Sequence, residues 1–384
     1  MSKIPKLRFK EFSGNWEEKV LDNIATFSKG KGISKADIDE NGTIECIRYG
    51  QLYTIYNELI KDIVSKTNVN ENNLVLSNYG DIIIPASGET QIDIATASCI
   101  LKDNVALGGD LNIIRAKEDG VFLSYYLNNA KKFDIARLSQ GISVVHLYSS
   151  QLKTLKLNLP QKQEQEKIAS FLTSVDTKIE QLTKKETLLK EYKKGVMQKI
   201  FNQEIRFVSD DGNEFCDWEE KKLGNLCKIT TGKLDANAMN ENGAYRFYTC
   251  AKEYFKINEY AFDTDALIVS GNGANVGYIH HYKGKFNAYQ RTYVLDGFKD
   301  VIFFLKYVLD KYLYKRIMRE KNEGNTPYIV MGTLADMMVS LPCLKEQTKI
   351  ANFLSSIDTK IEQTQKKLES SKEFKKALLQ QMFV

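Results

Sequence analysis

Basic and amide side chains, interleaved with aromatic ones, gather beside predicted turns in two segments, about residues 21–156 and 223–338. In the major groove, arginine pairs with guanine and asparagine or glutamine with adenine, while lysine and serine position phosphates. These groups indicate contact with double-stranded DNA, although each residue alone is weak support because polar loop residues are mostly solvated. In the first segment we predict DNA contacts by Lys29, Lys31, Lys35, Arg48, Tyr49, Gln51, Asn78, Tyr79, Ser87, Thr90, Gln91, Ser143 and His146. In the second we predict them for Lys233, Arg246, Tyr248, Asn272, Asn275, His280, Tyr282, Lys283, Gln290, Arg291, Asn325, Thr326 and Tyr328.

No motif for autonomous catalysis accompanies these side chains. The chain lacks the GxxxxGK(S/T) pattern of a phosphate-binding loop, and its isolated prolines exclude the (N/D)PP(Y/F) loop of a base-amine methyltransferase. The adjacent His280 and His281 would point to opposite faces of a strand, which makes a shared metal unfavourable. Ser270–Gly277 is glycine-rich without GxGxxG spacing, and we interpret it as a turn between strands. The sequence therefore predicts a non-catalytic chain that holds no metal or cofactor.

Length and composition predict a globular protein of two or three domains. The chain has 384 residues, of which 43% are hydrophobic and 27% charged. The longest apolar run, Val301–Leu305, is too short for a membrane span, and the N-terminus has no apolar stretch typical of a signal peptide. The six cysteines form no CxxC pair, which is typical of reduced cytosolic thiols. A net charge of +5 permits a polyanionic partner without requiring one. We predict a cytoplasmic protein with no membrane role.

The two segments that carry the polar groups have the pattern of mixed α/β domains. Short β-branched and aromatic runs alternate with Gly, Asn and Asp turns, which predicts strands. Predicted strands are Leu74–Leu76, Asp81–Ile84, Leu111–Arg115, Arg246–Thr249, Ala266–Val269, Gly277–His281 and Tyr289–Leu295. Each segment then contains a helical pattern, at Val121–Lys132 and at Val301–Ile317.

A duplicated stretch follows each segment. Residues 157–201 and 339–383 align without gaps, and more than half of the aligned positions are identical. Both copies have a proline ahead of the start and are rich in strong helix formers, which predicts helices of about 40 residues. A break near Ser174–Asp176 or Ser356–Asp358 stays open. Apolar residues recur in a heptad seam, which predicts that the two copies pair with each other as a coiled coil. An antiparallel coiled coil would place the two domains at opposite ends of a rod. The seam consists of Ile168, Leu172, Val175, Ile179, Leu182, Leu189, Ile350, Leu354, Ile357, Ile361, Leu368 and Leu378.

The duplication covers more than the helices. An entry pattern of Arg8-Phe9 and then Trp16 returns as Arg206-Phe207 and then Trp218. We therefore predict an α+β fold with pseudo-two-fold character, in which two globular mixed α/β domains are separated by the paired helices. The predicted segments are a first domain at 1–156, a first helical region at 157–202, a second domain at 203–338 and a second helical region at 339–384.

These motifs resemble the specificity subunits of type I restriction–modification systems. The resemblance rests on the Arg-Phe…Trp entries and on the LPxxxEQxKIAxFLxSxDTKIEQ blocks at 159–181 and 341–363, and it covers nearly the whole chain. It implies that the domains are target-recognition domains, each reading one half of a split, asymmetric DNA site. The helices would be the family's conserved regions, which fix the unread spacer and dock partner subunits.

The resemblance also implies a set of partners. These are two modification (methyltransferase) subunits, which methylate adenine and bind S-adenosylmethionine, and two restriction (translocase–nuclease) subunits. S-adenosylmethionine, ATP and Mg would then belong to the partners, with no cofactor in this chain.

Three other interpretations stay open. The chain could be an autonomous nuclease or methyltransferase with a degenerate motif. It could be a coiled-coil adaptor with two protein-binding domains and no DNA role, or a specificity-like subunit of a fused nuclease–methyltransferase system.

Overall fold

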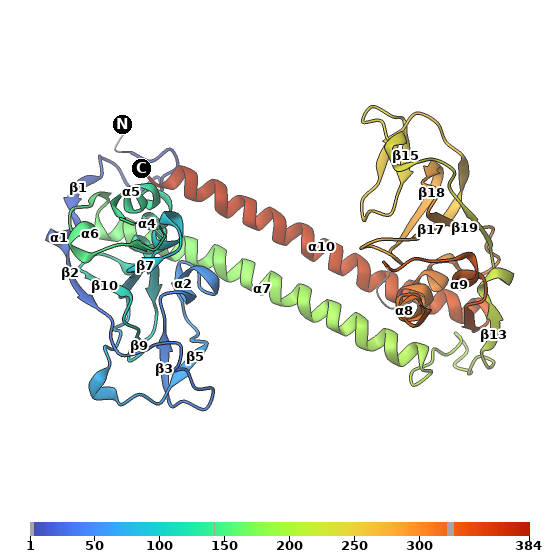
Figure 1. Ribbon diagram of the computed structural model, residues 1–384, viewed down its shortest axis with the longest axis horizontal. Helices are drawn as coiled ribbons and strands as arrows, with labels where there is room; N and C mark the ends of the chain where they lie inside the picture. The colour runs from blue at the N-terminus through green and yellow to red at the C-terminus, as the bar shows by residue number, and fades with distance from the viewer. Residues whose placement is uncertain (1–3, 142, 321–325) are drawn as a thin grey trace. The chain divides into compact units, whose positions relative to one another are not determined.

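The computed structural model describes residues 4–141, 143–320 and 326–384, which form two compact units (Figure 1). Unit 1 consists of Met1–Thr183 with Lys367–Val384, and unit 2 consists of Lys184–Lys366. Two long helices, α7 (Lys162–Phe201) and α10 (Leu344–Met382), each contribute one stretch to each unit.

Unit 1 is built around a five-stranded sheet in the order β2-β10-β6-β8-β4. The central strand β6 is a continuous apolar run whose two faces pack in different clusters. Ile82 and Ile84 lie in the cluster that contains the α4 side chain of Phe122, and Ile83 lies in a second cluster with Ile113. Helix α4 therefore covers one face of the sheet. A three-stranded sheet, β5-β3-β9, and the two-stranded pairs β1-β12 and β7-β11 complete the unit.

The elements of unit 1 ahead of α7 are β1 (Glu17–Val20), α1 (Leu21–Ile24), β2 (Ala25–Lys29), β3 (Ile44–Ile47), α2 (Gln51–Thr54), β4 (Leu59–Ile60), β5 (Ser65–Thr67), the 3-10 turn η1 (Glu71–Asn73), β6 (Ile82–Pro85), β7 (Ser87–Gly88), α3 (Gln91–Ile94), β8 (Ser98–Ile100), β9 (Ala106–Leu107), β10 (Leu111–Ala116), α4 (Gly120–Asn129), α5 (Lys132–Leu138), β11 (Val145–His146), α6 (Ser149–Leu152) and β12 (Lys156–Leu159).

Unit 2 is built around a six-stranded sheet in the order β14-β19-β17-β18-β15-β16, with a separate pair β13-β20. One apolar cluster joins the sheet residues Leu267 and Val269 to Phe304 of α8, so this helix covers one face of the sheet. The elements are β13 (Glu219–Lys222), η2 (Leu223–Asn225), β14 (Lys228–Thr231), η3 (Ala236–Ala238), β15 (Tyr245–Tyr248), β16 (Phe255–Ile257), β17 (Phe262–Ser270), β18 (Ile279–Ala288), β19 (Thr292–Asp296), α8 (Ile302–Glu320), α9 (Met331–Ala335) and β20 (Met338–Leu341).

Both long helices are continuous through the region where a break stayed open. In unit 1, Ile168 and Leu172 near the start of α7 share an apolar cluster with Leu378 near the end of α10. In unit 2, Leu189 in the second half of α7 packs against the cluster that contains Ile350 near the start of α10. The helices are therefore antiparallel within each unit, and residues of the predicted heptad seam meet there. Regular coiled-coil packing along their whole length stays a prediction.

Several predicted elements differ from the observed ones. Leu74–Leu76 is not a strand, because only Leu76 pairs, in an isolated bridge to Ala106. The single helix predicted over Val121–Lys132 is wrong, since α4 ends at Asn129 and α5 starts afresh at Lys132. The predicted turn at Ser270–Gly277 is confirmed, because β17 ends at Ser270 and β18 begins at Ile279.

Candidate nucleic-acid interface

An arginine–glutamate pair joins the entry segment of each unit to the first turn of a long helix. Arg8 donates to both carboxylate oxygens of Glu164, at 2.8 and 2.7 Å. Arg206 donates in the same way to Glu346, at 3.3 and 2.8 Å, and the indole N–H of Trp218 donates to that carboxylate at 3.3 Å. Both glutamates are buried, and a helix N-terminus favours their charge. The repeated entry pattern is thus a docking contact between domain and helix.

The next residue of each helix, a glutamine, adds three hydrogen bonds to the same contact. The Gln165 amide donates to Glu118 at 2.7 Å and to the Pro160 carbonyl at 2.9 Å, and its oxygen accepts from the backbone N–H of Asp119 at 3.1 Å. Gln347 repeats this pattern in unit 2, with one carboxylate, one proline carbonyl and one backbone amide. Both glutamine side chains are buried with their polar atoms satisfied, which fixes the angle at which each helix starts.

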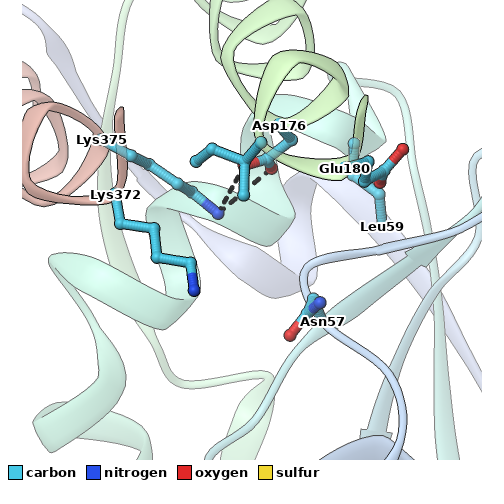
Figure 2. Close-up of a pocket in the computed structure, with 7 residues that line it drawn as sticks. Asn57, Leu59, Asp176, Glu180, Lys372 and Lys375 are labelled. Carbon is cyan, nitrogen blue, oxygen red and sulfur yellow. Dashed lines mark hydrogen bonds and ion pairs between the residues drawn. The ribbon is translucent and has the colours of Figure 1, made fainter. Parts of the chain in front are cut away.

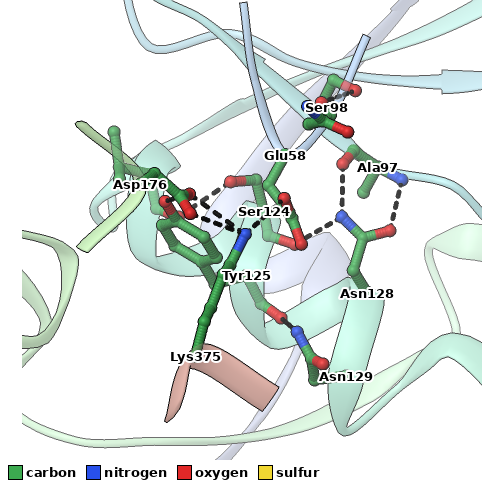
Figure 3. Close-up of polar contacts among 11 residues, drawn as sticks. Glu58, Ala97, Ser98, Ser124, Tyr125, Asn128, Asn129, Asp176 and Lys375 are labelled. Carbon is green, nitrogen blue, oxygen red and sulfur yellow. Dashed lines mark hydrogen bonds and ion pairs between the residues drawn. The ribbon is translucent and has the colours of Figure 1, made fainter. Parts of the chain in front are cut away.

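A polar cluster in unit 1 joins the domain to both long helices (Figure 3). The Tyr125 hydroxyl donates to Asp176 at 2.5 Å, and the Lys375 ammonium lies 2.8 Å from Asp176 and 3.1 Å from Glu58. Burial raises the pKa of Tyr125 well above its usual range, and the hydrogen bond to Asp176 raises it further. Burial opposes the charge of Lys375, but the two carboxylates outweigh it and raise the pKa of this lysine. The cluster links α4, α7, α10 and the residue ahead of β4.

Unit 2 repeats the cluster with one carboxylate fewer around the lysine. The Tyr307 hydroxyl donates to Asp358 at 2.7 Å, and the Lys193 ammonium lies 2.6 Å from the same carboxylate and 5.0 Å from the Tyr307 ring centroid. Burial raises the pKa of Tyr307 above its usual range. In the part of the chain that the structure describes, Lys193 has no second carboxylate partner comparable to Glu58.

A small hollow of about 210 Å³ borders the unit 1 cluster (Figure 2). It is lined by Asn57, Leu59, Asp176, Ile179, Glu180, Lys372 and Lys375. Two lysines from α10 face two carboxylates from α7 across it, so the charges balance. Because the hollow is small and holds no nucleophile or paired general acid and base, we assign it to the docking contact.

The predicted DNA-contact residues of unit 1 fall into two groups, a larger one that includes Lys31, Arg48 and Ser87 and a smaller one formed by Asn78 and Tyr79. Lys31 and Arg48 meet at the Leu107–Gly108 backbone, since the N–H of Lys31 donates to the Leu107 carbonyl and Gly108 donates to the residue before Arg48. Ser87 pairs with His146 across β7 and β11. Near these residues lie Lys29, at the end of β2, and Thr90 and Gln91, at the start of α3. The exposed Asn78 and Tyr79 precede β6, so the length of this strand separates them from Ser87.

Three of the predicted contact residues are buried in the fold. The Gln51 side chain accepts from the Arg48 backbone N–H at 2.8 Å and donates to Ser65 at 2.6 Å. Ser87 and Tyr248 are also buried. These three side chains support the surface without lying on it. The other exposed or half-buried residues of the prediction in unit 1 are Lys35, Tyr49 and Ser143.

In unit 2, an arginine is held between two aromatic rings. The Arg246 guanidinium lies 4.3 Å from the ring centroids of both Tyr254 and Tyr282, and it donates one hydrogen bond to the Tyr248 hydroxyl at 3.3 Å. No acceptor among the described residues takes its other donors. The hydrogen bond to Tyr248 raises the pKa of Arg246. The stem is thus fixed while most of the donor fork is available to a ligand.

A second group in unit 2 gathers around the turn between β17 and β18. Asn272 bridges to Tyr328, and the Asn275 amide donates to the Cys250 carbonyl at 3.1 Å. The Gly271 N–H donates to the Arg291 carbonyl, which brings that exposed residue to the same place. Gln290 and Lys233 lie beside Asp235, to which Gln290 donates at 2.7 Å, and Thr326 is exposed near Tyr328. Asn325, which the sequence predicted as a contact, lies outside the described residues.

The two adjacent histidines lie on opposite faces of β18, as predicted. His280 contacts the Ala251 carbonyl and the Tyr248 ring, whereas His281 hydrogen-bonds to Asp265 at 2.7 Å. Burial lowers the pKa of His280. Lys283, also a predicted contact, is exposed and lies 3.8 Å from Asp265. Among the residues described, no group of three or more His, Cys, Asp or Glu is arranged to hold a metal ion, and none of their helices is long and apolar enough to cross a membrane.

Both repeated halves of the chain match a known protein family. A family profile described as the type I restriction modification DNA specificity domain matches residues 13–191 and 216–370. The chain belongs to this family. DNA recognition in a type I restriction–modification system is therefore the role that its family membership supports.

Individual relatives agree with the family. The type I restriction enzyme EcoDI specificity subunit of Escherichia coli is 43% identical over 168 residues, which are 42% of this chain but only 37% of that protein. The type I restriction enzyme MjaVIII specificity subunit of Methanocaldococcus jannaschii is 25% identical over 97% of this chain and 94% of its own length. The crystal structure of a type I restriction–modification system S subunit from M. genitalium has a TM-score of 0.72 at 20% identity and covers 99% of both chains, which shows the shared fold.

Sequence reasoning missed the docking residues as a class. Glu164, Asp176 and their copies stand inside the repeated blocks, so their recurrence at a fixed spacing was a usable signal. Tyr125 and Tyr307 lie outside these blocks, in the diverged segments. Their separation in sequence equals that of Asp176 and Asp358, and only the structure shows that each tyrosine pairs with the matching aspartate.

Proposed function

We propose that this chain is the non-catalytic DNA-specificity subunit of a type I restriction–modification complex. Unit 1 reads one half and unit 2 the other half of a bipartite, asymmetric DNA target. The observation that carries the proposal is that the two units share one docking frame but present unlike exposed side chains. A symmetric pair of readers would require a palindromic site, whereas two unlike readers recognise two unlike half-sites.

The partners follow from family membership. Two modification subunits dock on the helical region and supply S-adenosylmethionine-dependent adenine methylation. Two restriction subunits join them and use ATP and Mg. This chain supplies recognition and positioning and binds none of these cofactors itself, and it works in the cytoplasm. The proposed contact residues are the exposed and half-buried members of the predicted DNA-contact sets, arranged around Lys31 and Arg48 in unit 1 and around Arg246 and Asn272 in unit 2.

Arg246 is the residue to which we assign a specific base. An arginine fork that pairs with O6 and N7 of guanine contributes about 1–3 kcal/mol of discrimination. Its stacking between Tyr254 and Tyr282 removes most of the entropy that an arginine loses on binding. We expect Arg246→Gln to relax the preference for guanine at one position of the half-site read by unit 2. The sequence of the other half-site should stay the same. Lys283→Gln, a loss of an exposed charge on the neighbouring strand β18, should weaken binding to all sequences alike.

Mapping methylated adenines in a host that carries the complex tests the proposal. Replacing residues 21–156 with the matching segment of a relative should change one half-site and preserve the other. If both halves change, the units do not read independently. A chain that gives no sequence preference in a footprint and no salt-sensitive DNA binding would instead be an adaptor without a DNA role. Methylation or cleavage by the purified chain alone would point to an autonomous enzyme, and a single neighbouring gene that fuses nuclease and methyltransferase would point to the fused system.

Spacer length gives an independent test of the helices. We expect that four residues inserted after Thr183, matched by four after Lys366, lengthen both helices by about 6 Å, at 1.5 Å per residue. The unread spacer should then grow by about one to two base pairs, at about 3.4 Å each. An unchanged spacer would show that the helices do not set the distance between half-sites.

A further inference from the structure

A row of basic side chains runs along α8 beside the second half of α7 in unit 2. Lys311, Lys315 and Arg319 follow one another at four-residue spacing, so they share one side of the helix. A hollow of about 690 Å³ lies between the two helices. It is lined by Lys190, Lys193, Lys194, Met197, Gln198, Asp310, Lys311, Tyr312 and Lys315. We call these residues the lysine hollow.

Three lysines of the hollow form no close ion pair within the described part of the chain, although the charge of Glu204 acts on Lys311 from a greater distance. Asp310 pairs with Lys306, which lies outside the hollow, and Glu186 and Asp358 pair with Lys190 and Lys193. No carboxylate lies within ion-pair distance of Lys194, Lys311 or Lys315 among those residues. Burial lowers the pKa of Lys311, which means that the fold disfavours the charge at this position.

The arrangement costs the free chain stability. Like charges four residues apart on one side of a helix destabilise it. Lys311, Lys315 and Arg319 make two such pairs on one helix. An anion bound in the hollow would remove this repulsion.

The hollow described in unit 1 shares the lysines of the long helix, Lys372 and Lys375, but no lysine of a domain helix lines it. The spacing that relates Tyr125 to Tyr307 relates Lys311 to Asn129 and Lys315 to Phe133. Asn129 hydrogen-bonds to its own helix, and Phe133 is exposed. The lysines on the long helices recur in both units, but those on the domain helix belong to unit 2 alone. The basic charge at these positions of the domain helix is therefore particular to unit 2.

We propose that the lysine hollow binds phosphate groups, and the source that the proposed function favours is the backbone of the duplex DNA that the complex holds. Lysine is a compact point charge suited to phosphate, and it adds affinity without adding sequence preference. The second source with the same chemistry is a free polyphosphate. This inference rests on the proposed function, because the duplex source requires that the chain bind DNA.

The test uses the full chain, alone and assembled with its modification subunits, and a random-sequence duplex as probe. Lys311→Gln with Lys315→Gln should lower the slope of log K against log salt by about two, because each lost phosphate contact removes about one unit. The methylated sites should stay the same. The matched control is Lys372→Gln with Lys376→Gln, which removes the same charge from exposed positions on α10 in unit 1. An equal change in the control would show a general charge effect and overturn the proposal.

A second arm distinguishes the two sources by thermal melting with inorganic tripolyphosphate. A melting shift that Lys311→Gln/Lys315→Gln abolishes, with an unchanged DNA salt slope, supports phosphate binding with a free polyphosphate as the source. If the double variant has the same salt slope and the same melting shift as the wild type, the proposal is wrong. It is also wrong if the double variant differs from the wild type only in weaker assembly with a modification subunit. A wild-type chain that binds no DNA would defeat the proposed function, and the tripolyphosphate arm would then decide the lysine hollow by itself.

Discussion

The docking contacts of the two units are nearly the same, whereas their exposed surfaces are not. Arg8 with Glu164 and Arg206 with Glu346 are the same contact in two domains, and each is followed by a glutamine with the same three hydrogen bonds. Away from these contacts, the side chains around the turns bear no such correspondence. A domain can thus change what it presents to DNA without changing how it is held, provided that the few buried polar partners stay.

Small differences within the docking frame allow the comparison to be tested. In unit 1, the Trp16 indole N–H is buried and has no partner among the described residues. In unit 2, the Trp218 indole donates to Glu346. The lysine of the polar cluster has two carboxylates in unit 1 and one in unit 2. The arginine side chain is 12% exposed in unit 1 and 25% exposed in unit 2.

The largest effect is expected from removing the glutamate of the docking contact. Glu164→Ala leaves the largely buried charge of Arg8 with backbone carbonyls but without its carboxylate, which typically costs about 3 kcal/mol or more. Glu346→Ala should cost less, because Arg206 is twice as exposed and can recover water. Hydrogen exchange under increasing urea, read on peptides of each unit, measures both losses. The control is Glu180→Ala, on the same helix as Glu164. It breaks an exposed ion pair with Lys61 and should cost under about 1 kcal/mol. Equal costs in the two units would show that exposure of the arginine does not decide the loss.

The next largest effect is expected at alkaline pH, which should lower the stability of the two units to different extents. Burial raises the pKa of Cys46 to about 11 and of Cys99 to about 12 in unit 1, and of Cys227 to about 12 in unit 2. Because the unfolded thiol loses its proton near pH 9.0, stability is fully present below that pH and declines as the pH rises toward the folded values. The raised pKa values of Tyr125 in unit 1 and of Tyr307 in unit 2 act in the same direction.

Unit 1 carries more of these groups, so its stability should fall more steeply than that of unit 2 above pH 9.0. Urea unfolding across this range, followed by hydrogen exchange in each unit, gives the two slopes. Cys99→Ala should flatten the slope of unit 1 whatever its effect on stability at neutral pH. Parallel slopes in the two units would contradict the prediction.

The sequence predicted the two long helices better than it predicted which polar residues are exposed. The heptad pattern and the prolines at 160 and 342 located both long helices, because helix formation there depends on local composition and a repeated apolar stripe. It failed at α4 and α5, where the apolar pattern runs through a break at Ala130–Lys131. Contact residues were predicted by type, and type does not report burial. Gln51 was therefore included although its amide is used within the fold, whereas the pairing of Tyr125 with Asp176 depends on tertiary contacts that no local pattern carries.

The smallest expected effect comes from making the polar cluster of unit 1 resemble that of unit 2. Glu58→Gln leaves Lys375 with Asp176 and Tyr125, as Lys193 stands with Asp358 and Tyr307. The carboxylate and ammonium are largely but not fully buried, so we expect a loss of about 1 kcal/mol in unit 1 and none in unit 2. The pKa of Lys375 should fall, since one of the two carboxylates that raise it is gone. The ammonium resonances of lysine in nuclear magnetic resonance spectra and urea unfolding measure the two changes. A loss as large as that of Glu164→Ala would mean that Glu58, which belongs to the diverged segment, holds unit 1 on its helices as firmly as the repeated docking contact does.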